Sequence, residues 1–146
     1  MEILTAPIRM IRDIRALGGG IRIWGAALNL PQIIGGVIFI ATIEGLAILV
    51  TALATLLVAG NIHRKAPFSR LISICHLPWL GLAPWLIGQM LGKEFSTAML
   101  IWLIYVTGTI IVSLVLDIRE IILYFRGDRV FAWAETGDHA KQGGTK

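Results

Sequence analysis

The sequence predicts an all-α, multi-pass membrane protein, from its composition and from the spacing of its charges. Of the 146 residues, 56% are hydrophobic and only 15% are charged, which is too apolar for a soluble domain of this length. Between residues 32 and 61 the one acidic or basic side chain is Glu44, and residues 96–116 hold none. Apolar runs of about 20 residues match the roughly 30 Å hydrocarbon core of a bilayer. Inside that core every backbone polar group needs a partner, so we expect these runs to be helices.

Residues 1–22 predict an amphipathic helix that lies in the membrane interface. Ile8-Arg9 is followed at steps of three by two further Ile-Arg pairs, and a fourth pair comes later. Steps of three keep the isoleucines within one broad helical face and the arginines on a neighbouring face. We expect the apolar face to meet lipid and the arginines to meet lipid headgroups; packing of this helix against the rest of the protein is the alternative. The headgroup candidates are Arg9, Arg12, Arg15 and Arg22.

Residues 23–62 allow two interpretations. One helix over residues 31–59, starting near Asn29 and Pro31, would be about 43 Å long and would cross the membrane once with some tilt. Alternatively, two helices would meet in a turn at Glu44-Gly45, giving four crossings in the whole chain. That hairpin would have almost no polar loop, so we favour the single crossing and three crossings in all.

Two further crossings are predicted at residues 71–91 and 97–116. Pro78, Gly81 and Pro84 predict a kink in the first of them. The second continues as a charged extension to residue 126, and residues 135–146 are polar enough to predict a flexible tail. The chain is thus one membrane domain over residues 1–146. Its stretch 117–129 resembles the last helix of small bacterial inner-membrane proteins, which implies that location but no function.

The distribution of basic residues bears on topology. Basic side chains gather in the connector around Arg64, Lys65 and Arg70 and again after residue 117, whereas the turn between the last two crossings has only Lys93. The positive-inside rule therefore predicts a cytoplasmic C-terminus. With three crossings the arginine-rich N-terminus lies outside, against that rule, while with four crossings every basic segment is cytoplasmic.

Glu44 is the main candidate for an intramembrane site. In the three-crossing interpretation it lies near the middle of the bilayer, where a carboxylate is costly and functional by default. By helix rise, residues of the third crossing reach the same depth. We expect a polar stripe at four-residue steps to face it, made of Tyr105, Thr109, Ser113 and Asp117.

His76 is a weak candidate for a cofactor ligand. We expect it to differ from Glu44 by about 12 Å in depth, which excludes a direct acid–base pair between them. A single intramembrane histidine offers no ligand pair, so we expect a hydrogen-bonded packing role, no metal and no cofactor.

Small residues at four-residue steps predict close helix packing. One set lies after Glu44 in the same apolar region, and a second set lies in the next crossing. The candidates are Ala47, Thr51, Thr55, Ala59, Gly88 and Gly92.

Function is predicted mainly by exclusion. The chain contains no nucleophile, metalloprotease, P-loop or dinucleotide motif, so we expect no enzyme. We expect a non-catalytic accessory or structural subunit that binds the lipid bilayer and other membrane subunits, in a hetero-complex rather than a homo-oligomer, and no nucleic acid. The alternative is a small oligomeric channel or transporter that uses Glu44 as a proton or cation site. The polar stripe covers only Tyr105 to Asp117, which favours the accessory subunit.

Overall fold

A computed structural model describes residues 2–15 and 19–131 of the protein, so the predicted tail at residues 135–146 lies outside the described residues. The described chain is helical, which confirms the all-α prediction, and an N-terminal helix is present. Its elements are α1 (Glu2–Arg15), α2 (Gly19–Ile38), α3 (Ile43–Lys65), the 3-10 helix η1 (Arg70–His76), α4 (Trp79–Gly92) and α5 (Thr97–Phe125).

Three stretches are long and apolar enough to cross a membrane, as predicted for an integral membrane protein. They are Ile43–Lys65, Arg70–Gly92 and Thr97–Phe125. The middle one combines η1 and α4, and the two helices meet at Leu77 and Pro78. The last one has 29 residues and is therefore about 43 Å long, enough to extend beyond the hydrocarbon core.

The prediction of one helix over residues 31–59 is wrong, because the chain turns between α2 and α3. The turn occupies residues 39–42, slightly before the alternative position at Glu44-Gly45. Thr42 makes this short hairpin possible, since its hydroxyl donates to the carbonyl of Phe39 at 2.8 Å and accepts from the amide of Gly45 at 3.1 Å. A single threonine thus caps α3 and replaces the polar loop that we expected a hairpin to need.

Pro31 lies inside α2 and does not begin a helix. A proline has no N–H, so it leaves the carbonyl four residues earlier without its helical partner. Here that carbonyl belongs to Ala27, and the hydroxyl of Tyr105 on α5 donates to it at 2.9 Å. The carbonyl of Pro31 in turn accepts from the indole Nε1 of Trp102 at 2.8 Å. The proline therefore becomes a contact point between α2 and α5.

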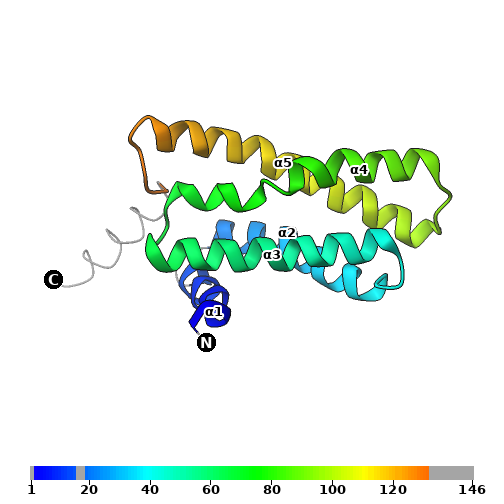
Figure 1. The fold of residues 1–146 in the computed structure, drawn as a ribbon, viewed down its shortest axis with the longest axis horizontal. Coiled ribbons are helices and arrows are strands. Elements are labelled where there is room, and N and C mark those ends of the chain that lie inside the picture. The colour runs from blue at the N-terminus through cyan, green and yellow to red at the C-terminus, as the bar shows by residue number, and fades with distance from the viewer. Residues whose placement is uncertain (1, 16–18, 132–146) are drawn as a thin grey trace.

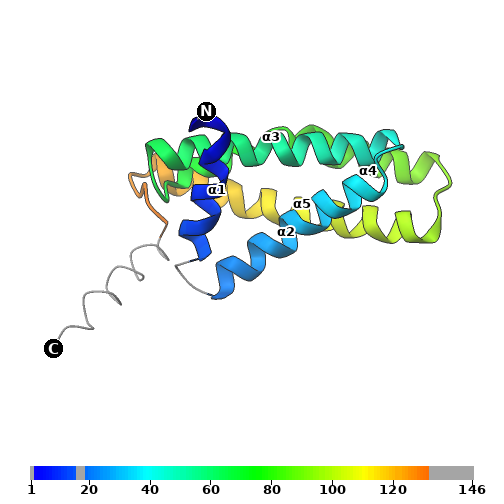
Figure 2. The same cartoon turned by 90° about the horizontal axis from the view of Figure 1, so that it is seen from below.

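The helices form two hairpins that run along the long axis of the molecule (Figures 1 and 2). The turns at residues 39–42 and 93–96 lie at the same end, which we call the turn end. The connector 66–69 and the C-terminal part of α5 lie at the opposite end, and α1 lies across the bundle there (Figure 2). We call this the basic end, because it holds the basic residues of α1, of the connector and of residues 117–131.

α1 packs directly onto α3. Ala6 and Met10 are buried, and Met10 shares an apolar cluster with Ala59 of α3. Gly60 allows the close approach, because a Cβ atom there would lie 2.5 Å from the backbone nitrogen of Pro7. α1 thus has a packed face as well as an exposed arginine face, and its place in the membrane interface stays a prediction.

The core is built from one face each of α2 to α5. Its largest fully buried side chains include Ile48, Trp79, Leu86 and Leu103. Large aliphatic residues such as Leu91 and Ile101 are exposed on the outer faces instead. This inside-and-outside apolar pattern is what a bilayer-embedded helix bundle requires.

Candidate functional site

A cavity of about 310 Å³ lies near the basic end of the bundle. α1, α2, α3, η1, α5 and the segment after α5 all contribute to its walls. Most of the wall is aliphatic or aromatic, but a group of polar side chains also reaches it. These are Asn29, Thr55, His63, Ser73, His76, Ser113, Asp117 and Glu120.

His76 and Asp117 form a close pair at this cavity. The imidazole Nδ1 of His76 lies 2.6 Å from the Oδ2 of Asp117, and the hydroxyl of Ser113 donates to the same oxygen at 3.4 Å. The His76 ring also stacks on Trp79, with the ring centroids 4.0 Å apart. Because Nδ1 faces a carboxylate, we place the ring proton there, which leaves Nε2 as an acceptor. No described residue hydrogen-bonds to Nε2.

A second histidine, His63, connects α1, α3 and the connector. Its Nδ1 accepts from the backbone N–H of Phe68 at 3.3 Å, and its Nε2 lies 3.1 Å from the Oδ2 of Asp13. A neutral imidazole with its proton on Nε2 satisfies both partners. Phe68 has a φ of 55°, which is uncommon for a residue with a side chain. We interpret His63 as a structural residue.

Arg70 fastens the segment after α5 to the start of η1. It is 4% exposed, it bonds to Glu120, and its Nη2 donates to Asp128 at 2.7 Å. The backbone N–H of Arg70 also donates to the carbonyl of Arg129 at 3.0 Å. A buried guanidinium needs carboxylate partners, and Glu120 and Asp128 supply them; of the three residues, Glu120 also lines the cavity.

Glu44 lies at the start of a helix, and not in the middle of one as the three-crossing interpretation expected. It occupies the first turn of α3 at the turn end, is 3% exposed, and accepts from the Nζ of Lys93 at 2.8 Å. The earlier turn is the reason, because it moves Glu44 from the middle of a helix to its N-terminus. A carboxylate there is favoured by the helix dipole and by Lys93. Among the described residues, no hydrogen bond or ion pair joins Glu44 to the predicted polar stripe.

That stripe splits into separate contacts along α5. Tyr105 bonds to Ala27, as described above. The hydroxyl of Thr109 donates to carbonyls of its own helix, at 2.9 Å to Val106. Ser113 donates to Asp117 within α5. Of these four residues, Asp117 alone is bonded to a side chain of another described element, the imidazole of His76.

The predicted packing residues fall into two groups. Those of α3 face the interior: Thr55 and Ala59 are buried, and Ala47 packs against the main core. Gly88 and Gly92 of α4 are exposed instead. A Cβ atom at either position would meet nothing within 4 Å outside its own helix, and the same holds for Gly81. The predicted headgroup residues Arg9, Arg12, Arg15 and Arg22 are all exposed.

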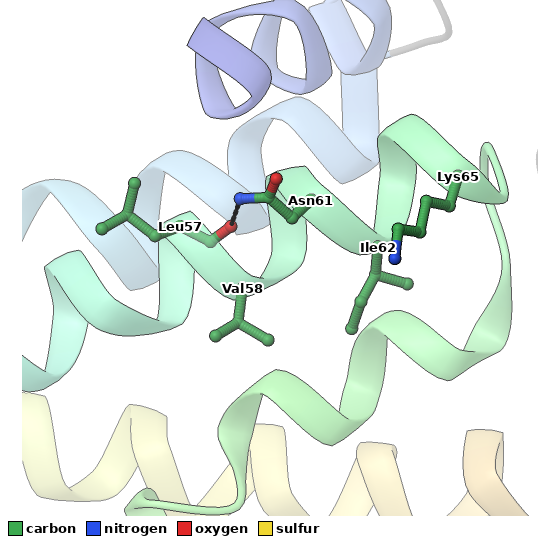
Figure 3. A pocket seen from close by; sticks show the side chains of 5 residues that line it. All are labelled: Leu57, Val58, Asn61, Ile62 and Lys65. Atoms are coloured by element: carbon green, nitrogen blue, oxygen red, sulfur yellow. Dashed lines mark hydrogen bonds between the residues drawn. The ribbon is translucent and has the colours of Figure 1, made fainter. Parts of the chain in front are cut away.

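A second hollow, of about 280 Å³, lies on α3 itself and differs in character (Figure 3). Its walls come from α3 alone. The amide of Asn61 donates to the carbonyl of Leu57 at 2.8 Å, so this polar group is used within the helix. We therefore take the interior cavity as the candidate site. The residues of the hollow are Leu57, Val58, Asn61, Ile62 and Lys65.

Sequence reasoning missed both histidine–aspartate pairs. His76 and Asp117 lie near the same end of neighbouring crossings, so matching their depths would have joined them. Asp13 and His63 gave no such signal, because their contact depends on how α1 docks. Within the described residues no group of three or more His, Cys, Asp or Glu side chains is placed to hold a metal.

Comparison of the chain with protein families, with curated proteins and with solved structures finds no match.

Proposed function

We propose that the protein is a non-catalytic accessory subunit that packs against a transmembrane helix of a larger membrane complex. The observation that carries this proposal is the exposed glycine face of α4, formed by Gly81, Gly88 and Gly92. The spacings of seven and four residues place the three glycines on one side of the helix.

Glycines on a lipid-facing helix surface let another helix approach closely, and this contact is a main source of helix association in membranes. Inside the chain, close approaches of this kind are already used: Gly36 packs on Leu49, and Gly60 packs on Pro7. The α4 face has the same residue type but no partner among the described residues. Glycine also lowers helix stability by about 1 kcal/mol relative to alanine. An unpartnered glycine face therefore has a cost that a docked helix would offset.

The charge distribution favours a partner other than a second copy. Copies in one membrane share one orientation, so their basic ends would lie side by side and repel each other. The same distribution supports an orientation with the basic end, and with it the C-terminus, in the cytoplasm. We place the protein in the bacterial inner membrane, with the arginines of α1 on anionic headgroups.

A channel or transporter that depends on Glu44 is less well supported. The carboxylate of Glu44 lies in the first turn of α3 and forms a salt bridge with Lys93. It therefore offers no unpaired charge along a path through the bilayer. We therefore prefer the accessory subunit.

A leucine scan of two exposed positions tests the proposal. Gly88→Leu fills the α4 face, while Ala54→Leu adds similar bulk to the exposed face of α3. Each tagged variant is expressed at native level, extracted in mild detergent and examined by native mass spectrometry. We expect the parent and Ala54→Leu to retain a second protein at constant stoichiometry, and Gly88→Leu to lose it.

Leucine is a better helix former than glycine, so loss of the partner would not reflect unfolding of α4. Thermal unfolding of the purified variants checks this directly. A parent that travels alone as a monomer contradicts the proposal, and so does a Gly88→Leu variant that keeps its partner.

A further inference from the structure

We propose that the interior cavity binds the ring of a neutral, lipid-soluble aromatic molecule that bears a hydroxyl group, of the phenol or quinol class. This inference concerns the inside of the bundle and is independent of the proposed α4 contact. It depends on the polar side chains that line the cavity, on its charge balance, and on its walls, size and position.

Two side chains at the cavity have unused hydrogen-bonding capacity. Thr55 is 3% exposed, and its Oγ1 is buried with no partner among the described residues. A buried hydroxyl without a partner costs about 1–3 kcal/mol. The second atom is Nε2 of His76, which is left as an acceptor because Asp117 holds the opposite nitrogen. One site therefore offers a hydroxyl that can donate and an imidazole that can accept. A ligand hydroxyl has both complementary functions, whereas a plain ketone or ether has only the acceptor function.

The charges at the cavity favour a neutral ligand. Its two carboxylates, Asp117 and Glu120, would repel an anion. Glu120 is ion-paired with Arg70, and the Oδ2 of Asp117 is used in hydrogen bonds with His76 and Ser113. What remains is neutral hydrogen bonding inside a largely apolar wall.

The walls and the volume favour a single aromatic ring. Trp24, Phe68 and Phe131 line the cavity together with aliphatic residues such as Leu28 and Ile72. A volume of about 310 Å³ is at the lower end of ligand sites, which run from about 300 to 1,000 Å³. It suits one substituted ring and leaves any alkyl tail outside, among the lipid chains.

The position of the site agrees with such an amphiphile. His76 ends η1, whose first residue, Arg70, lies at the basic end. The six steps of 3-10 helix from Arg70 to His76 rise about 12 Å, so His76 lies below the headgroups but not at the bilayer centre. A molecule dissolved in the membrane, with its hydroxylated ring near the interface, would meet the cavity at this depth.

The test compares two buried threonines of the same bundle. Thr55 and Thr107 are both nearly fully buried, 3% and 4% exposed, and the hydroxyl of each lacks a partner. Only Thr55 lines the cavity. Thr55→Val and Thr107→Val remove the same hydroxyl and keep the shape of the side chain, so their difference isolates the cavity.

The full-length protein in nanodiscs is titrated by calorimetry with a short-chain benzoquinol and with its dimethyl ether, which has the same ring but no hydroxyl donor. We expect saturable binding of the quinol to the parent, a Kd raised about tenfold by Thr55→Val, and a Kd within twofold of the parent for Thr107→Val. His76→Phe keeps an aromatic ring beside Trp79 and removes the acceptor, and we expect it to raise the Kd by a similar factor. The ether should bind weakly and respond to none of these changes.

Equal binding of the quinol and its ether overturns the inference, because it indicates partitioning into an apolar space. Equal effects of the two valine substitutions, or no saturable quinol binding to the parent, overturn it as well.

Discussion

Replacing Gly60 with alanine tests how closely α1 approaches α3. A Cβ atom at this position would lie 2.5 Å from the nitrogen and 2.7 Å from the Cα of Pro7. Ordinary van der Waals contact starts near 3.4 Å, so the two helices must separate by roughly 1 Å, and the atoms in the way are backbone that cannot rotate aside. Overpacking of this kind costs about 1–3 kcal/mol.

The cost falls on the docking of α1. Because α3 stays helical whether α1 is docked or detached, the higher helix propensity of alanine cancels in that equilibrium. At about 1.4 kcal/mol per tenfold change, the detached population should rise roughly 5- to 140-fold. Met10 is 5% exposed in the docked helix. A cysteine at position 10, in a background that lacks Cys75, therefore becomes accessible only in the detached population and measures its size.

The measurement is the rate of maleimide labelling at position 10, under conditions where α1 docks again on α3 faster than the reagent reacts. Gly108→Ala is the matched control, since a Cβ atom at that mid-helix glycine of α5 meets nothing within 4 Å. It should leave the labelling rate unchanged and raise the stability of the whole protein by up to about 1 kcal/mol. Equal labelling rates for the Gly60→Ala and Gly108→Ala variants would refute the close contact.

Two further predictions concern the turn end. Lys93→Met leaves the carboxylate of Glu44 buried and unpaired; because Lys93 is itself about half exposed, we expect a loss of about 1–3 kcal/mol in the free energy of unfolding. Glu44→Gln in the same chain should restore most of that loss, and a double variant no more stable than Lys93→Met contradicts the pairing. For orientation, a membrane-impermeant maleimide added to intact cells should label cysteine at position 94 and not at position 65, and the reverse pattern would place the basic end outside.

The two spans at residues 71–91 and 97–116 were predictable because bilayer thickness sets their length and the cost of a charge sets their composition. The break between α2 and α3 was not, because its evidence is local and small. Thr42 is one hydroxyl in an apolar run, and its two hydrogen bonds to Phe39 and Gly45 exist only once the turn has formed. A hairpin is usually recognised by a polar loop in the sequence. Here the hydrogen bonds of Thr42 close the turn and cap α3, and no polar loop is needed.

Pro31 was wrongly interpreted as a helix start, for a related physical reason. A proline within an apolar run is most simply a helix start, because inside a helix it leaves a carbonyl unsatisfied. The hydroxyl of Tyr105 removes that cost, but only through a contact 78 residues away in sequence. Tyr105 was included in a polar stripe on the basis of spacing along α5, which shows the face of a residue and not its partner.

The distribution of basic residues agrees with the way the described helices are arranged. It required all basic segments at one end, and the only objection was the missing loop near Glu44. With the turn at residues 39–42, α2 returns the chain and brings the arginine-rich N-terminal segment to the same end of the bundle as the connector and the end of α5 (Figure 2). The charge pattern reflects the whole set of crossings at once, whereas the loop argument depended on a few residues. Where the two conflict in an apolar chain, a capping threonine next to a lone acidic residue is the feature to look for, because together they can form a hairpin and a salt bridge to the neighbouring turn.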